Sequence, residues 1–188
     1  VGEPVAMVFA DKYAQARVAA DMIGFEVDDL PVHPALQPGG PILHDAAPNN
    51  VAFDWALGDS AQMEAVKAKA AHVLSFEISD NRVICNSMEP RGCWADIEDG
   101  RLHLCVNGQG VWSQKGQLAK MLGLPESEIR VTNPDVGGGF GMKAMAYPEY
   151  FLAAQAARML NRPVRWMSDR SEAMLSDNGG RDLTSTAT

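Results

Sequence analysis

Hydrophobic residues recur along the chain at two spacings. Short apolar or alternating runs, typical of β-strands, occupy residues 5–10, 25–27, 72–78, 81–85, 94–97, 102–106, 129–132 and 164–167. Apolar residues at helical spacing predict helices over residues 11–23, 59–71, 112–122 and 147–160. Because helices and strands are interspersed along the chain, the pattern predicts an α/β fold with mixed, α+β-like sheets that begins with a β-α-β unit.

Turn-forming residues set several boundaries between these elements. Asp99-Gly100 separates two alternating runs and is a strong signal for a β-hairpin. We interpret Asp80-Asn81 as a second turn between two strands. Pro148 suits the first turn of a helix, and Pro163 prevents the same helix from continuing far beyond Asn161.

Prolines and glycines are concentrated between residues 31 and 50, where no periodic pattern is visible. We interpret this stretch as a linker or an irregular crossing segment. It predicts a domain boundary near residue 45, with residues 1–45 in one domain and residues 46–188 in a second.

The composition narrows the classes of protein that fit the chain. Of the 188 residues, 46% are hydrophobic and 21% are charged, which is typical of a globular protein. The net charge of −8, with scattered Lys and Arg, argues against nucleic acid as a partner. No apolar stretch reaches the roughly 20 residues that span a bilayer, and the first residues show no signal peptide.

The cysteines and histidines show no metal-ligand spacing. Cys85, Cys93 and Cys105 include no C-x-x-C pair, so neither a zinc site nor an iron–sulfur cluster is predicted. Reduced, buried thiols in a cytoplasmic protein are the expected state. The four histidines lie far apart, and we expect surface positions or satisfied core positions for them. An active-site role for His44 is the alternative to a polar surface position.

Residues 135–143, with the sequence DVGGGFGMK, carry the strongest chemical signal. Four of the five positions from Gly137 to Gly141 are glycine, and Phe140 is the exception. A backbone without β-carbons reaches positive φ angles and approaches a ligand closely. The stretch follows a predicted strand and precedes a predicted helix, which is a recurrent position for loops that bind phosphate groups.

The residues alone leave two functions open for this loop. Its N–H groups could form a concave cradle for an anion, or the glycines could form a tight corner without a ligand. The two usual nucleotide-binding loops are excluded. The glycines are consecutive rather than spaced as G-x-G-x-x-G, and Gly141 is not followed by Lys and then Ser or Thr.

The run at residues 134–143 resembles the P-D-V-G-G-G-F-G-x-K signature of the molybdenum hydroxylases, the xanthine dehydrogenase and aldehyde oxidase family. Within it, the chain is most similar to large subunits of the aerobic carbon monoxide dehydrogenase type. Further similar stretches are residues 2–6, 44–52, 86–91, 109–125, 162–165, 169–172 and 180–182. The resemblance implies that residues 1–45 are the end of an α/β-hammerhead domain and residues 46–188 the first part of a molybdopterin-binding domain.

The resemblance also implies site residues. The residues that correspond to cofactor-binding positions are Gln109, Gly138, Gly139, Phe140 and Gly141. Gln109 and the backbone amide of Phe140 are expected to contact oxo ligands of the molybdenum without coordinating the metal. From its residue type alone Gln109 reads as a surface residue, and Asn107-Gly108 before it departs from the Ser-Thr or Thr of many members. The Phe140 ring is expected at the substrate channel, in the core, or both.

Residues 86–91 match the family's N-x-M-E-P-R run. The residue types favour a rigid turn held by a pair between Glu89 and Arg91. The alternative is that one of these side chains faces a substrate funnel. The resemblance supports a position near the pocket and assigns no catalytic role to Glu89.

The resemblance implies a molybdenum-dependent dehydrogenase or hydroxylase that oxidises carbon monoxide, an aldehyde or an N-heterocycle with water as the oxygen source. The expected cofactor is molybdenum–molybdopterin in its cytosine dinucleotide form. The expected partners are a [2Fe-2S] iron–sulfur small subunit and an FAD-binding medium subunit.

The family's large subunits are several times longer than this chain, and their catalytic base is a glutamate from a late segment. We therefore expect a fragment with no catalytic residue of its own that is inactive alone. The alternatives are a non-catalytic module that binds a phosphate-bearing ligand through the glycine loop and a purely structural module.

Overall fold

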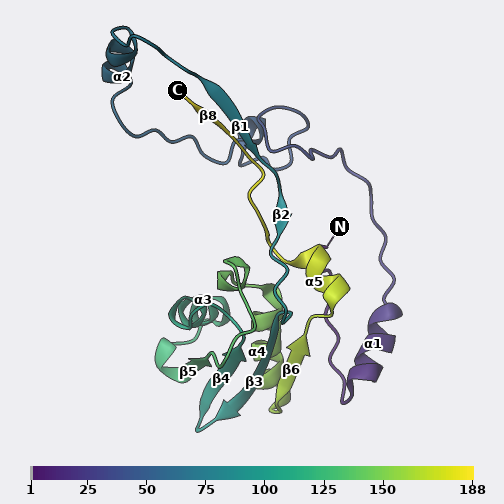
Figure 1. Cartoon of the computed structure of the whole chain (residues 1–188). Helices are drawn as coiled ribbons and strands as arrows, with labels where there is room; N and C mark the ends of the chain where they lie inside the picture. The colour runs from purple at the N-terminus through teal and green to yellow at the C-terminus, as the bar shows by residue number, and fades with distance from the viewer. Residues whose placement is uncertain (1) are drawn as a thin grey trace. The chain divides into compact units, whose positions relative to one another are not determined.

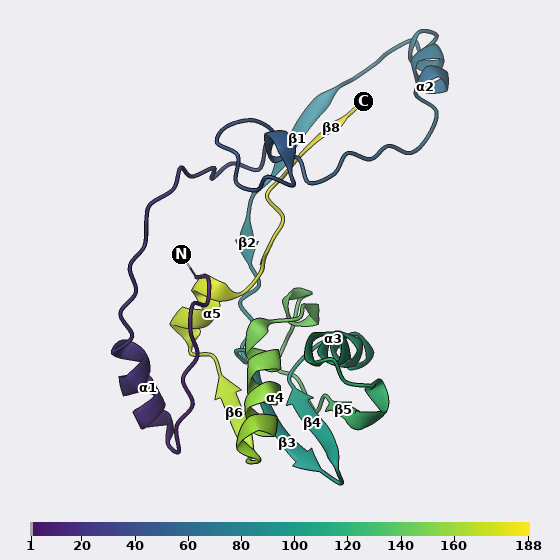
Figure 2. The same ribbon diagram turned by 180° about the vertical axis from the view of Figure 1, so that it is seen from behind.

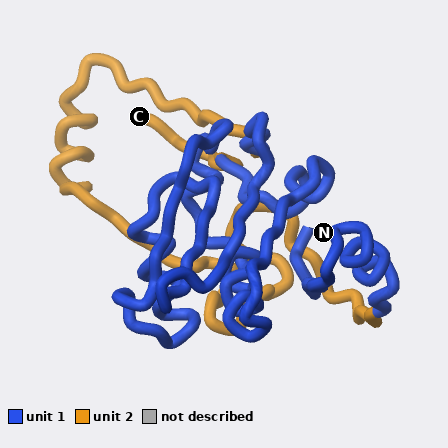
Figure 3. The backbone as a smooth tube through the Cα atoms, turned by 90° about the horizontal axis from the view of Figure 1, so that it is seen from below, with its two compact units in different colours: residues 1–24, 83–180 blue, residues 25–82, 181–188 orange. Residues whose placement is uncertain are grey.

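The computed structural model describes residues 2–188 and divides the chain into two compact units (Figure 3). Unit 1 comprises residues 1–24 and 83–180, and unit 2 comprises residues 25–82 and 181–188. All buried core residues belong to unit 1. The two units are not the two domains that the sequence predicts, whose boundary near residue 45 stays a prediction.

A four-stranded mixed sheet with helices packed against it forms the centre of unit 1 (Figure 1). β4 pairs in parallel with β5, whereas β3 pairs antiparallel with both β4 and β6. Helix α4 lies behind the sheet in Figure 1 and in front of it in Figure 2. The mixed sheet confirms the predicted α/β class. In sheet order the strands are β5 (Ile129–Thr132), β4 (Arg101–Val106), β3 (Gly92–Glu98) and β6 (Val164–Met167), and the helices are α3 (Trp112–Leu122) and α4 (Pro148–Leu160).

Alternation along β4 explains which face of the sheet the helices cover. Leu102, Leu104 and Val106 are all buried and belong to the hydrophobic core. Three alanines of α4, at positions 153, 154 and 157, are buried in the same core. Their small side chains let the helix approach the sheet closely, so the leucines of β4 fill the space between the two layers.

His103, also on β4, is buried and both of its ring nitrogens have hydrogen-bonding partners. Of the two positions expected for the histidines, surface or satisfied core, it occupies the second. It is 5% exposed, and its two ring nitrogens lie 2.7 Å from Glu98 Oε2 and 2.7 Å from Thr132 Oγ1. The ring also packs edge-on against Trp94. These contacts tie the hairpin to the neighbouring parallel strand.

The signals for the Asp99-Gly100 hairpin and for the two ends of α4 are confirmed. Asp99 and Gly100 both have positive φ angles, 51° and 74°, as a two-residue hairpin between β3 and β4 requires. Helix α4 begins at Pro148, and Asn161 ends it in the left-handed conformation at φ 49°.

Two predicted strands near the N-terminus are wrong. Residues 5–10 and 25–27 are irregular and take part in no strand pairing among the described residues. Phe25 and Val27 are 63% and 68% exposed, so the apolar side chains that suggested a buried strand are not buried in this structure. The helix predicted between them is present as α1 (Tyr13–Asp21).

The predicted turn at Asp80-Asn81 does not join a hairpin. β1 (Phe76–Asp80) pairs antiparallel with β8 (Leu183–Ala187) in unit 2. β2 (Val83–Ile84) pairs with β7 (Gly179–Gly180) in unit 1. The two apolar runs therefore find partners about a hundred residues away instead of each other. Unit 2 also contains α2 (Ser60–Lys67), which Asp59 caps by accepting the Gln62 N–H.

The strand directions bring four connections to one edge of the sheet. Because β4 and β5 are parallel, the segments that follow both strands leave at the same edge. Because β3 is antiparallel to β4 and β6, the segment that enters β3 and the segment that leaves β6 lie at this edge too. Ligands of open α/β sheets commonly bind beyond the carboxyl ends of parallel strands.

Candidate functional site

The glycine loop follows β5 and adopts a backbone that most residues avoid. Gly138 and Gly141 have φ angles of 95° and 88°. Phe140, between them, has φ 53°, which is uncommon for a bulky residue and is found mostly where the surrounding structure holds it. Met142 N–H donates to the Gly139 carbonyl at 3.0 Å and closes the loop into a short 3-10 turn, η3 (Met142–Ala144).

Three consecutive backbone donors of the loop face no acceptor. Within residues 2–188, no hydrogen bond is formed by the N–H groups of Gly138, Gly139 or Phe140. The neighbouring N–H groups are used, since Gly137 donates to Glu89 and Gly141 donates to Gln109, each at 2.9 Å. The loop therefore has three consecutive N–H groups, called the donor row below, that remain available to an anion or to the oxygen atoms of a ligand.

Gln109 lies beside this row. Its backbone N–H donates to the Lys143 carbonyl at 3.1 Å, and its Oε1 accepts the Gly141 N–H at 2.9 Å. Because the carboxamide oxygen is occupied, the Nε2 end is left to donate, and it has no partner within residues 2–188. A β-carbon at Gly139 would lie 2.5 Å from Gln109 Oε1. Glycine at 139 is thus what leaves room for the glutamine.

The unusual Asn107-Gly108 pair fits the same arrangement. Asn107 accepts the Gly92 N–H and donates to the Pro90 carbonyl, both at 2.8 Å, and so joins the end of β4 to the start of β3. A β-carbon at Gly108 would lie 3.3 Å from the Lys143 carbonyl oxygen, closer than most such contacts. Asn107 and Gly108 thus fix the backbone that leads to Gln109 in this chain.

The Phe140 ring does not pack in the core, so that half of the prediction is wrong. The residue is 74% exposed. The ring lies over Gly138, where an added β-carbon would be 3.1 Å from its edge. An exposed aromatic ring on a strained backbone beside the donor row is available to a ligand rather than to the core.

The predicted ion pair between Glu89 and Arg91 is wrong, because the two side chains have different partners. Glu89 pairs with Lys143 at 2.9 Å, and the Lys143 side chain is fully buried. Partial burial acts to raise the pKa of the Glu89 carboxyl, but hydrogen bonds from Lys143 and Gly137 outweigh it, and the net shift is downward.

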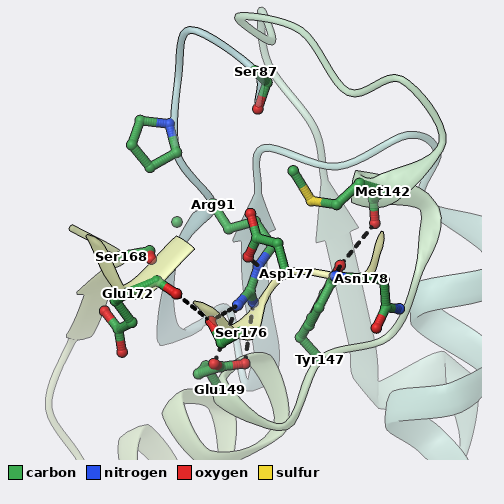
Figure 4. Close-up of polar contacts among 12 residues, drawn as sticks. Ser87, Arg91, Met142, Tyr147, Glu149, Ser168, Glu172, Ser176, Asp177 and Asn178 are labelled. Carbon is green, nitrogen blue, oxygen red and sulfur yellow. Dashed lines mark hydrogen bonds and ion pairs between the residues drawn. The ribbon is translucent and has the colours of Figure 1, made fainter. Parts of the chain in front are cut away.

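Arg91 is fully buried at the start of β3 and sits in a cage of acceptors (Figure 4). Its guanidinium donates to both carboxylate oxygens of Glu149, at 3.1 and 3.3 Å, and to Asp177. Its Cζ atom lies 3.6 Å from the centre of the Tyr147 ring. Burial alone would lower the pKa of Arg91, but the two carboxylates raise it above its ordinary value. A buried charge with this many partners is a fixed part of the scaffold.

Tyr147 connects this cage to the glycine loop. Its hydroxyl donates to the Met142 carbonyl at 3.1 Å and accepts the Asn178 N–H at 3.1 Å (Figure 4). The residue is 5% exposed, and burial raises the pKa of its phenol. Met142 is the first residue of η3, so Tyr147 anchors the end of the glycine loop to the cage.

The described cysteines are all free, and one of them touches the loop. The Cys85 thiol donates to the Phe140 carbonyl at 3.5 Å. Cys93 lies in the core, where burial raises the pKa of its thiol to about 12. Within residues 2–188 no group of three His, Cys, Asp or Glu side chains is arranged to hold a metal ion. None of the described helices is long and apolar enough to cross a membrane.

Sequence reasoning missed two residues that hold the site together. Lys143 was visible only as part of the loop signature, yet its side chain and its carbonyl contact Glu89 and Gln109, respectively. Asn133 follows β5 and donates to the Gly108 carbonyl. All three contacts join segments more than twenty residues apart, and a single sequence carries no local signal for them.

The arrangement fits the cofactor that the resemblance implies. The donor row and the Gln109 amide can donate hydrogen bonds to ligand oxygens, and the glycines let such a ligand approach the backbone. The two ionisable side chains that hold the ends of the loop in the described part of the chain, Glu89 and Lys143, are engaged with each other. It can therefore bind and orient a group more readily than it can transfer protons.

Comparisons with known proteins point the same way. A family model described as a molybdopterin cofactor-binding domain matches residues 43–188. The nicotine 6-hydroxylase large subunit of Paenarthrobacter nicotinovorans is 39% identical over 94% of this chain and 22% of that protein. The carbon monoxide dehydrogenase large chain of Hydrogenophaga pseudoflava is 33% identical over 96% of this chain and 25% of that protein.

A solved structure supports the fold. The crystal structure of a Cu,Mo-CO dehydrogenase matches 90% of this chain with a TM-score of 0.78 and 30% identity, and the match covers 24% of that chain. The chain thus spans about a quarter of the length of these relatives.

Proposed function

Because the chain belongs to the molybdopterin cofactor-binding family of the molybdenum hydroxylases, we propose that it forms the cofactor loop in the large subunit of a molybdenum-dependent oxidoreductase. The observation that carries the proposal is the position of Gln109, which accepts the Gly141 N–H beside three N–H groups, those of Gly138, Gly139 and Phe140, that have no partner within residues 2–188. The family match supports this reading over a phosphate-binding or purely structural module.

Each proposed residue has a separate task at the cofactor. The N–H groups of Gly138, Gly139 and Phe140 donate to its oxygen atoms. Gln109 donates through Nε2, because Gly141 holds its carboxamide oxygen. At Gly141 an added β-carbon would meet no atom of residues 2–188 within 4 Å, so the space beside this glycine is open to a ligand. These groups bind and orient the cofactor.

When bound, the molybdenum cofactor supplies a two-electron oxidation of the substrate with water as the oxygen source. The exposed Phe140 ring beside the donor row is proposed to line the approach of a small-molecule substrate. We assign no catalytic base to this chain, in keeping with a glutamate contributed from elsewhere in the large subunit.

The whole enzyme is proposed on the pattern of its relatives. Carbon monoxide, an aldehyde or an N-heterocycle is the proposed substrate, since relatives are named a carbon monoxide dehydrogenase, an aldehyde oxidase and a nicotine hydroxylase. Those named as large subunits or as subunits of a complex support a [2Fe-2S] small subunit and an FAD medium subunit as partners. We further propose that the cofactor is the cytosine dinucleotide form and that residues 1–45 belong to an α/β-hammerhead domain. The proposed location is the cytoplasm.

Analysis of the released cofactor tests this proposal. The protein is expressed from its complete reading frame with its genomic neighbours, and pterin and cytidine monophosphate are measured after oxidative and acid release. We expect both in equal amounts, and a much lower amount in the Gln109→Ala variant. Absence of pterin, in a host that loads a control molybdenum hydroxylase, would contradict the proposal.

A further inference from the structure

Glu89 joins the two ends of the glycine loop. Its Oε2 atom accepts the Gly137 N–H and the Lys143 ammonium, both at 2.9 Å. Its own N–H donates to the Gly137 carbonyl at 3.1 Å. We propose that Glu89 is a positioning residue for the cofactor loop, which fixes the donor row and Gln109 through Gly137 and Lys143. This inference rests on the proposed function for its consequence at the cofactor.

The burial of Lys143 makes the contact specific. The Lys143 side chain is fully buried, and Glu89 is its ion-pair partner within residues 2–188. The Glu89 side chain is 36% exposed and keeps access to water. Removing the carboxylate therefore strands a buried cation, whereas removing the ammonium leaves a carboxylate that water can solvate. The two single substitutions are expected to differ in effect for this reason.

Through Lys143, Glu89 also governs Gln109. The Lys143 carbonyl accepts the Gln109 N–H at 3.1 Å, so a shift of Lys143 moves the backbone that carries the glutamine. At the other end, Gly137 immediately precedes the donor row. A β-carbon at Gly137 would lie 2.5 Å from the Glu89 β-carbon, so the two residues are in direct contact. One side chain thus sets both boundaries of the row.

Glu89 is itself held in place. The Ser87 hydroxyl, 1% exposed, donates to the Glu89 carbonyl at 2.9 Å. Pro90, which follows Glu89, restricts its own backbone and that of Glu89. The Pro90 carbonyl also accepts a hydrogen bond from the Asn107 side chain. A carboxylate on such a rigid turn can impose its geometry on a glycine-rich loop, which has little rigidity of its own.

The test compares four variants of the protein expressed from its complete reading frame with its neighbours. They are Glu89→Gln, Lys143→Met, the double variant with both changes, and Glu149→Gln as the matched control. The control also removes the charge of a carboxylate that pairs with a fully buried cation, Arg91, but the Glu149 side chain forms no hydrogen bond with residues 136–144 among the described residues. Hydrogen–deuterium exchange over residues 136–144 and pterin content are measured for each.

We expect Glu89→Gln to speed exchange over residues 136–144 by about tenfold to a hundredfold and to lower pterin content. Lys143→Met has a smaller effect on both. The double variant returns toward the wild type, because glutamine still accepts the Gly137 N–H and no buried charge remains. Glu149→Gln speeds exchange in α4 and in α5 (Arg170–Ser176) more than in the loop.

Three results would overturn the inference: wild-type exchange in Glu89→Gln, equal loop exchange in Glu149→Gln, or a double variant no better than Glu89→Gln. The last two results mean that Glu89 contributes only general stability. If the wild-type protein contains no pterin, the proposed function is wrong. The exchange rates still show whether Glu89 holds the loop in place, because they do not depend on the cofactor.

Discussion

Replacing Gly139 by alanine separates a ligand-binding loop from a structural corner. An added β-carbon would lie 2.5 Å from Oε1, 2.6 Å from Cδ and 2.8 Å from Cγ of Gln109, and these are the three nearest atoms. Gly139 does not have the left-handed φ angle of its neighbour Gly138, so alanine suits its backbone. The substitution therefore displaces one flexible side chain and breaks its hydrogen bond from Gly141.

The expected change in stability is small. Loss of the hydrogen bond between Gly141 and Gln109 costs about 0.5–1.5 kcal/mol, since both groups are exposed and water replaces the contact. Reduced freedom of the unfolded chain offsets about 0.4–1 kcal/mol of this. The melting temperature should therefore shift by no more than about 4 °C. Pterin content, by contrast, should fall by about tenfold or more, because Gln109 is the residue displaced.

Gly116→Ala is the matched control for this experiment. Gly116 lies inside α3, and an added β-carbon would meet Glu126 at an ordinary distance of 3.6 Å. Alanine there should raise the free energy of unfolding by about 0.5–1 kcal/mol and leave pterin content unchanged. Full pterin retention in Gly139→Ala would refute the assigned place of Gln109. A fall of more than about 10 °C in its melting temperature would favour the structural corner.

Two further predictions concern the scaffold beneath the loop. Arg91→Met leaves the carboxylates of Glu149 and Asp177 without their buried cation. The free energy of unfolding, measured with urea, should therefore fall by about 3–5 kcal/mol. A loss below about 1 kcal/mol would show that the cage is not a fixed part of the scaffold. Alkaline pH should destabilise the protein, because burial raises the folded-state pKa of Cys93 to about 12 and that of Tyr147 above its ordinary value. Their contribution is complete below the unfolded-state pKa values, about 8.5 and 10, and is lost as pH rises toward the folded-state values. Denaturant midpoints that stay constant from pH 8 to about pH 11 would contradict this assignment.

Local chemistry explains which parts of the fold could be predicted from the sequence. Asp99-Gly100, Pro148 and Asn161 act on their own backbone, so the hairpin and the limits of α4 follow from residue type alone. The parallel pairing of β4 with β5 then brings Gln109 to the glycine loop. The glycine loop was singled out by its signature, and Gln109 by the separate similar stretch at residues 109–125.

Contacts between distant segments explain what could not be predicted. Asp80-Asn81 was interpreted as a turn because turn-forming residues separate two apolar runs, but β1 has its partner in β8, near the end of the chain. Glu89 and Arg91 are two residues apart and oppositely charged, yet their backbone directs them to Lys143 and Glu149. Pairings of this kind depend on topology, which a single sequence does not specify.

The molybdenum content of the purified protein tests the central claim most directly. The protein is expressed from its complete reading frame with its genomic neighbours and is measured by elemental mass spectrometry. The account predicts close to one molybdenum atom per chain. A preparation without molybdenum, from a host that inserts the cofactor into a control enzyme, would contradict the assignment of the glycine loop and Gln109 as a molybdenum cofactor site.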